Sequence, residues 1–208
     1  MKRFPGIELV KWLGLAAMVY DHVDAYSTVT LPLASHVGAV AFPFFVYAMF
    51  AALADAPAGK VRDVVRRMFA WAVVAQIAVL FVRDGFPLNV LFTLAAALAV
   101  SGVYRLDRVN ATHVFLALPF VLIALLAEFS LAGLLFALVV AGEIQRGWSR
   151  WWTVAAALPL FAFNELSFAA CAAAIAASII SKQGPSIGRI PRIFYPLYVV
   201  QWPLLRLL

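Results

Sequence analysis

The amino-acid sequence predicts an all-α protein: a polytopic transmembrane bundle of about nine helices that forms a single domain over residues 1–208. Hydrophobic residues make up 65% of the chain and charged residues only 12%, and the mean hydropathy is +0.97. A soluble domain averages roughly 45–50% apolar and about 25% charged residues. In lipid the backbone must be hydrogen-bonded internally, and the apolar runs show no two-residue alternation, so each run is predicted to be a helix.

The predicted helices follow the apolar runs in order along the chain. The first run follows Lys2 and Arg3 and ends in Tyr20-Asp21-His22 without a small-residue cleavage site, so we expect a retained span rather than a signal peptide. The fifth and seventh runs are shorter than the roughly 17–25 residues of a full crossing, which favours short or tilted helices there. The predicted ranges are 7–24, 32–54, 65–83, 87–104, 113–127, 130–145, 151–164, 167–181 and 192–208.

Positive charge gathers in alternate loops, which predicts an orientation. One side of the predicted bundle holds most of the 16 lysines and arginines, and the opposite side holds only Arg83 and Arg206. Because lysine and arginine are retained on the cytoplasmic side, we expect an N-in, C-out protein of a bacterial inner membrane. The net charge of +6 is therefore an orientation signal, and the expected partner is the lipid bilayer and not nucleic acid. The opposite loops carry Asp24, Asp84, Glu128 and Glu165.

Motifs for metals, phosphates and reactive thiols are missing from the sequence. The single cysteine, Cys171, lies in an apolar run and excludes an intramolecular disulfide, so we expect a buried and inert side chain. There is no phosphate-binding glycine loop, no metal-ligand spacing and no GxSxG elbow. We expect no metal, and any catalysis must use isolated groups within the membrane.

Ionisable residues in the first predicted helix are the main site hypothesis, because such groups are costly inside a span. Glu8 and Lys11 are three residues apart and are predicted to form an ion pair. Asp21 and His22 point about 100° apart on a helix, so one of them needs a partner from another helix. That they are ordinary interfacial residues ending a helix is equally compatible with the spacing. Candidate partners are His36, Arg83, Asp84, Asn89, Asn164 and Glu165.

Two basic turns, residues 60–67 and 182–192, face the predicted cytoplasmic side. Such clusters anchor proteins to anionic lipid headgroups, and they also suit the phosphates of a cytosolic cofactor. The sequence leaves both interpretations open.

Several segments together resemble the TraX family of membrane acetyltransferases, named for the enzyme that N-acetylates conjugative pilin. They occur in the family's order over nearly the whole chain. Two positions depart from the family pattern: Ala39 stands where an arginine is expected, and Tyr198 stands where a histidine is usual. In the wider superfamily of polytopic membrane acyltransferases, a histidine is also common at the position of Gln201. The matching segments are Lys11-Trp12 through Tyr20-Asp21-His22, residues 37–45, Arg66-Arg67 with Ala75-Gln76-Ile77, residues 86–94, and residues 194–198.

The resemblance implies acetyl-CoA as the donor and the N-terminal amine of a pilin as the acceptor. His22 is then the expected base, Asp21 orients it or binds the acceptor ammonium, and Asn89 is a polar contact at the reacting centre. The expected phosphate-binding residues are Arg66, Arg67, Arg105, Arg189 and Arg192. The expected substrate-binding residues are Asp24, His36, Glu165 and Tyr198.

The departures at Ala39 and Tyr198 leave two alternatives. One is an acyltransferase for a sugar or lipid hydroxyl. The other is a non-catalytic membrane component, such as an assembly scaffold or small transporter, that has kept the fold.

Overall fold

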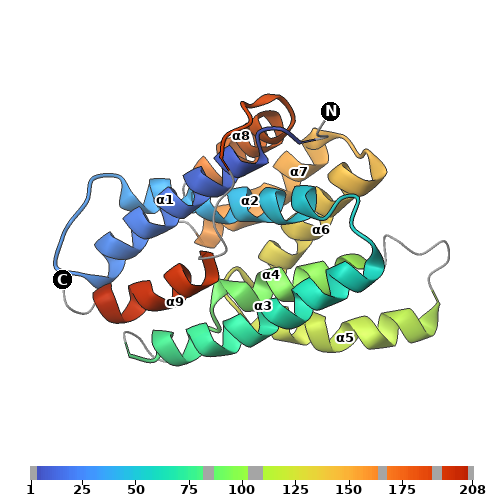
Figure 1. The fold of residues 1–208 in the computed structure, drawn as a ribbon, viewed down its shortest axis with the longest axis horizontal. Helices are drawn as coiled ribbons and strands as arrows, with labels where there is room; N and C mark the ends of the chain where they lie inside the picture. The colour runs from blue at the N-terminus through green and yellow to red at the C-terminus, as the bar shows by residue number, and fades with distance from the viewer. Residues whose placement is uncertain (1–3, 82–86, 103–109, 164–167, 189–193, 206–208) are drawn as a thin grey trace.

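The computed structural model describes residues 4–81, 87–102, 110–163, 168–188 and 194–205 (Figure 1). Within these ranges the regular structure is helical apart from one isolated bridge between Leu88 and Ala127. The prediction of an all-α fold is therefore confirmed. The helices are α1 (Ile7–Tyr26), α2 (Ala34–Ala52), α3 (Ala58–Val79), α4 (Val90–Ser101), α5 (Ala111–Leu126), α6 (Ser130–Arg146), α7 (Arg150–Ala157), the 3-10 segment η2 (Leu158–Phe163), α8 (Ala169–Gln183) and α9 (Phe194–Leu205).

Two helices differ from the predicted ranges for identifiable reasons. Helix α3 begins at Ala58, seven residues before the apolar run, because its first turns are amphipathic and keep their basic side chains in solvent. The seventh run is α-helical only to Ala157 and continues as a 3-10 segment that contains Pro159, which has no N–H to donate to the preceding turn.

Among the described helices, α2 alone has the length and hydropathy of a membrane span, with a mean hydropathy of 1.5 in its best window. Helix α1 is 20 residues long but carries Glu8, Lys11, Asp21 and Asp24. Helices α4, α5 and α8 are apolar but shorter. The number of crossings stays a prediction.

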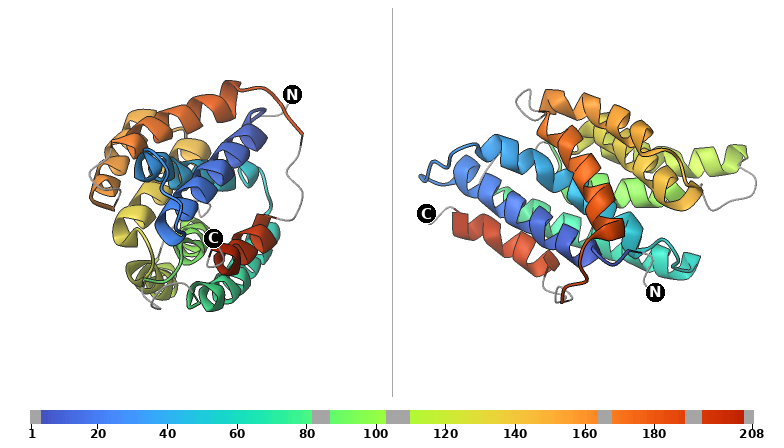
Figure 2. Two further views of the ribbon diagram at one scale, coloured as in Figure 1. Left: turned by 90° about the vertical axis from the view of Figure 1, so that its left-hand side faces the viewer. Right: turned by 90° about the horizontal axis from the view of Figure 1, so that it is seen from above.

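Helix α2 occupies the centre of the bundle, and most of its side chains are buried. It packs against α1, α8 and α6. Helix α9 lies along α3 and also contacts α1, as the two views of Figure 2 show. The site described below lies where α1 meets α2 on one side and α9 on the other.

Helix α5 buries a single side chain, that of Ala124. Its other faces carry large apolar side chains that are about half exposed or more. A soluble monomer rarely exposes an apolar surface of this extent, so this face requires a non-aqueous neighbour. The exposed residues are Val114, Phe115, Leu116, Leu118, Leu122, Leu125 and Leu126.

Candidate functional site

A cavity of about 470 Å³ lies between the C-terminal half of α1, the start of α2 and the turn that joins α5 to α6. One wall is apolar and includes Phe42, Phe45 and Val90. The cavity is large enough for the reacting end of a substrate and mixes apolar walls with a few polar groups, as ligand pockets do. Its polar lining residues are Asp21, His22, Tyr26, Ser35, Glu128 and Ser130.

Asp21 lies directly over Gly38 of α2. A Cβ atom at residue 38 would come within 2.1 Å of Asp21 Oδ1, so only glycine leaves room for the carboxylate. The next residue, Ala39, also lines the cavity. At the position where the TraX pattern has an arginine, the wall therefore carries a methyl group.

The His22 ring packs among aromatic rings of α1 and α9. Its centroid lies 4.6 Å from Trp202, 5.8 Å from Tyr26 and 6.4 Å from Tyr198. Asp21 thus meets α2 while His22 meets α9, so these two neighbouring residues contact different helices. The structure brings Tyr198 to His22, although its side chain is buried behind the cavity wall.

Asn89 is a correction to the predicted site. It is fully buried and its Oδ1 accepts a hydrogen bond from Leu91 N at 3.1 Å, which caps α4. Its Nδ2 donates to Ala72 O at 2.8 Å and to Gln76 Oε1 at 2.9 Å on α3. These bonds use its polar atoms to fix α4 against α3, and Asn89 is not among the residues that line the cavity.

Asp24 and His36 also lie outside the cavity lining. Asp24 Oδ1 accepts a hydrogen bond from Leu31 N at 2.6 Å and so organises the loop between α1 and α2. The exposed side chain of His36 lies 3.3 Å from Ser35 Oγ, and it is Ser35 that lines the cavity. The predicted substrate contact of Glu165 lies outside the described residues.

Of the predicted phosphate-binding arginines, Arg66 and Arg67 are described, and both side chains are exposed on α3. Arg67 interacts electrostatically with Tyr195 at the start of α9. The Tyr195 ring in turn stacks on Trp71, with ring centroids 6.1 Å apart and planes 8° apart. Arg105, Arg189 and Arg192 lie outside the described residues. The predicted ion pair of Glu8 and Lys11 is confirmed, at 2.8 Å.

The turn between α5 and α6 is a part of the site that the sequence did not identify. Glu128 N donates to Leu88 O at 2.8 Å and Thr93 Oγ1 donates to Glu128 O at 2.5 Å, which fixes the turn against the start of α4. The next two residues, Phe129 and Ser130, have φ of 64° and 47°. Non-glycine residues in the left-handed region are strained and concentrate at functional sites, and here both line the cavity.

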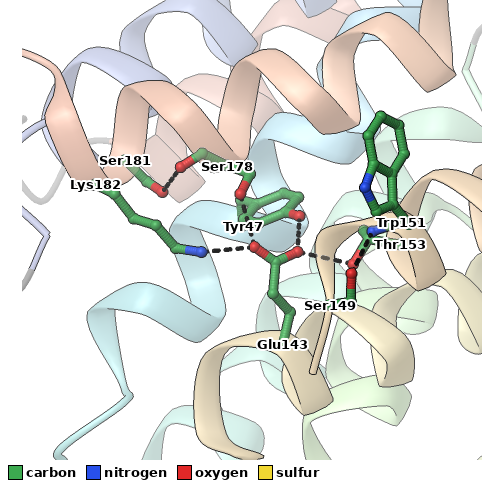
Figure 3. Close-up of polar contacts among 8 residues, drawn as sticks. All are labelled: Tyr47, Glu143, Ser149, Trp151, Thr153, Ser178, Ser181 and Lys182. Atoms are coloured by element: carbon green, nitrogen blue, oxygen red, sulfur yellow. Dashed lines mark hydrogen bonds and ion pairs between the residues drawn. The ribbon is translucent and has the colours of Figure 1, made fainter. Parts of the chain in front are cut away.

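A second polar cluster surrounds Glu143 of α6, which is only 5% exposed. Figure 3 shows its carboxylate between side chains from α2, α7 and α8. A carboxylate accepts about four hydrogen bonds, so these donors satisfy it and tie four helices together. The donors are Tyr47 Oη at 2.5 Å, Ser178 Oγ at 2.6 Å, Lys182 Nζ at 2.7 Å and Thr153 Oγ1 at 2.8 Å.

Glu143 was missed although its sequence carried a signal. It is an ionisable residue within the predicted apolar helix 130–145, the same property that singled out Asp21 and His22. Neither Glu143 nor its donors line the cavity. We therefore assign this cluster a role in holding the bundle together.

The fold and the cavity together define an all-α protein in which a histidine and two carboxylates lie between helices around a partly open pocket. The family model described as TraX protein matches residues 6–208, so the chain belongs to the TraX family. The resemblance inferred from short motifs is thereby confirmed. Neither the curated proteins nor the solved structures include a match.

Three of the motif segments meet at the cavity. Asp21 and His22 form one side, Gly38 receives Asp21, and Thr93 holds the backbone of Glu128. Motif residues that are far apart in the sequence thus support one site.

Proposed function

We propose that the chain is a multi-pass inner-membrane acetyltransferase that moves an acetyl group from cytosolic acetyl-CoA to the N-terminal amine of a conjugative pilin. Membership of the TraX family supports the pilin and conjugation context. The observation that carries the chemical part is the cavity in which His22, Asp21 and Glu128 face a common space with apolar walls.

The exposed surface supports the membrane location. The apolar faces of α5 suit lipid chains, and the basic turns lie in alternate loops. Tryptophans 151 and 152 are exposed beside Arg150 at the start of α7. Tryptophan and arginine at a helix end are typical of the membrane interface.

Acetyl transfer to an amine needs a carboxylate to bind the ammonium and a base to remove a proton. Asp21 suits the first role and His22 the second. The freed amine nitrogen then attacks the thioester carbon, and the C–S bond breaks as the tetrahedral intermediate collapses. The coenzyme thiolate leaves and takes up the second proton, which the nitrogen loses as the amide forms, while His22 releases the first proton to solvent. Tyr26 and Ser35 line the same cavity, and their hydroxyl groups suit the role of hydrogen-bond donors to the developing oxyanion.

The donor fits the arrangement of charge. Arg66 and Arg67 are exposed on the first half of α3, where they suit the nucleotide phosphates. Arg105, Arg189 and Arg192 remain predicted contributors. In this proposal the donor is held there and extends its thioester end along the bundle toward His22.

The test is the intact mass of a candidate pilin co-expressed with the protein. With the wild-type chain we expect the mature pilin to gain one acetyl group, and with His22→Gln we expect the gain to fall at least 100-fold, as is typical for loss of a general base. His113→Gln is the matched control, because His113 lies in the first turn of α5 and not in the cavity. A correctly cleaved pilin without an acetyl group would count against the proposal, as would full activity of His22→Gln.

The methyl group of Ala39 in the cavity wall favours one second candidate, an acyltransferase for a hydroxyl acceptor such as a sugar or lipid. Without the family's arginine, the wall offers a different surface to the acceptor. Acetyl-CoA turnover by purified protein in native lipid, with no pilin present, would indicate this alternative. Failure to bind acetyl-CoA at all would instead indicate a non-catalytic assembly component.

A further inference from the structure

Gln201 of α9 is buried without the hydrogen bonds that its side chain needs. The residue is 7% exposed, and neither Oε1 nor Nε2 has a hydrogen-bond partner within the described part of the chain. Buried polar side chains almost always have partners, and leaving one unsatisfied is costly. The carboxamide therefore has both a donor and an acceptor left for a group that is not part of the described chain.

The position of Gln201 suggests which group that is. Tyr198, Gln201, Trp202 and Leu205 are the buried residues of α9 and recur every three or four positions, so they share the face that packs against α1 and α3. Trp202, the next residue, contacts the His22 ring. Gln201 itself is not among the residues that line the cavity, and it is placed near His22 through its chain neighbour Trp202.

The opposite end of α9 meets the basic part of α3. Tyr195 stacks on Trp71 and interacts with Arg67. With a rise of about 1.5 Å per residue, the seven residue steps from Tyr195 to Trp202 cover about 10 Å along the helix. Helix α9 thus runs from an arginine suited to phosphate to the histidine suited to the acetyl group. Figure 2 shows this helix beside α3 and α1.

A carboxamide offers one carbonyl acceptor and an N–H donor side by side, which is complementary to a secondary amide. The arm of coenzyme A between its phosphates and its sulphur contains secondary amides, one of them two carbons from the sulphur. We propose that Gln201 binds this amide and so holds the thioester against His22, an inference that rests on the proposed function. It is a binding and positioning residue, because it touches the donor arm and not the reacting atoms.

The first experiment measures acetyl-CoA affinity and thermal stability of the purified full chain. Gln201→Leu removes the polar atoms and keeps the volume. We expect acetyl-CoA to bind about five- to tenfold more weakly, while the melting temperature without ligand is unchanged or higher because an unsatisfied group is gone. Gln145→Leu is the matched control: Gln145 Oε1 on α6 is also buried without a partner in the described ranges, and we expect unchanged affinity.

The second experiment varies the donor. S-acetyl-N-acetylcysteamine keeps the amide next to the thioester, and S-ethyl thioacetate has none. Wild-type protein is expected to prefer the first donor in kcat/KM, and Gln201→Leu is expected to lose most of that preference while its rate with S-ethyl thioacetate stays the same.

The outcomes separate the two proposals. Wild-type protein that does not bind acetyl-CoA would overturn the acetyltransferase and this inference together. Wild-type binding with equal affinity in Gln201→Leu, or an unchanged donor preference, would overturn the inference alone. A lower melting temperature in both Gln201→Leu and Gln201→Met, without ligand, would also overturn it, because the amide would then have a structural partner.

Discussion

Replacing Glu143 tests whether its cluster holds the bundle together. In Glu143→Leu, the hydroxyls of Tyr47, Thr153 and Ser178 lose their shared acceptor. All three side chains are buried, and a buried polar group that loses its partner costs about 1–3 kcal/mol in a water-soluble protein. Lys182 is 40% exposed and turns to solvent, so its contribution is small.

The magnitude depends on the surroundings of the cluster. In an aqueous protein, three orphaned hydroxyls predict a loss of at least about 3 kcal/mol. In lipid, interhelical hydrogen bonds average only about 0.6 kcal/mol, which predicts a loss of about 2 kcal/mol for three. We expect the smaller value, since we propose that these helices lie in a membrane.

The assay is reversible unfolding of the purified protein in mixed micelles, followed by circular dichroism. The control is Glu8→Gln, which removes a partly exposed ion pair within one helix and is expected to change the unfolding free energy by less than about 1 kcal/mol. Tyr47→Phe removes one donor and is expected to lose about a third of the effect of Glu143→Leu. A Glu143→Leu protein as stable as the Glu8→Gln control would refute the reasoning.

Two further substitutions test the neighbourhood of the cavity. Gly38→Ala would force Asp21 Oδ1 away from its position, so we expect the acetylation rate to fall at least tenfold. The control is Gly59→Ala, whose Cβ meets nothing within 4 Å and which should leave the rate unchanged. Equal rates in the two variants would contradict the contact between Asp21 and residue 38. Asn89→Ala removes a helix cap and two hydrogen bonds to α3, and it is expected to lower the unfolding free energy by about 2 kcal/mol, at the upper end for an N-cap. The control, Asn110→Ala, removes an exposed cap and is expected to cost about 1 kcal/mol or less. Thermal melts of both variants check this, and an equal loss would mean that the bonds to α3 add no stability.

The helices were predictable because each follows a local property of the sequence. An apolar run needs a helix, and the runs are separated by charged turns, so nine helices were found close to their observed bounds within the described ranges. The start of α3 was missed because its basic, amphipathic turns are not apolar. Local composition thus predicted the apolar parts of the helices and missed the amphipathic turns.

The site was predictable only where one helix carried the signal. Asp21 and His22 were identified because ionisable residues end an otherwise apolar helix. The position of Glu128 in the cavity wall depends on a strained turn, and the residue types in that turn do not predict its conformation. Asn89 was assigned to chemistry because its sequence motif does not reveal that α3 supplies two acceptors for its amide. Such pairings are set by packing between helices and not by neighbours in the chain.

The cluster around Glu143 also constrains the order in which the protein is assembled. Tyr47 precedes its acceptor by 96 residues, and Ser178 follows that acceptor by 35. Two of the four donors, Ser178 and the counter-ion Lys182, lie on α8 and are therefore the last part of the cluster to be synthesised. A chain truncated before α8 would keep only two of the four donors to this carboxylate, those of Tyr47 and Thr153.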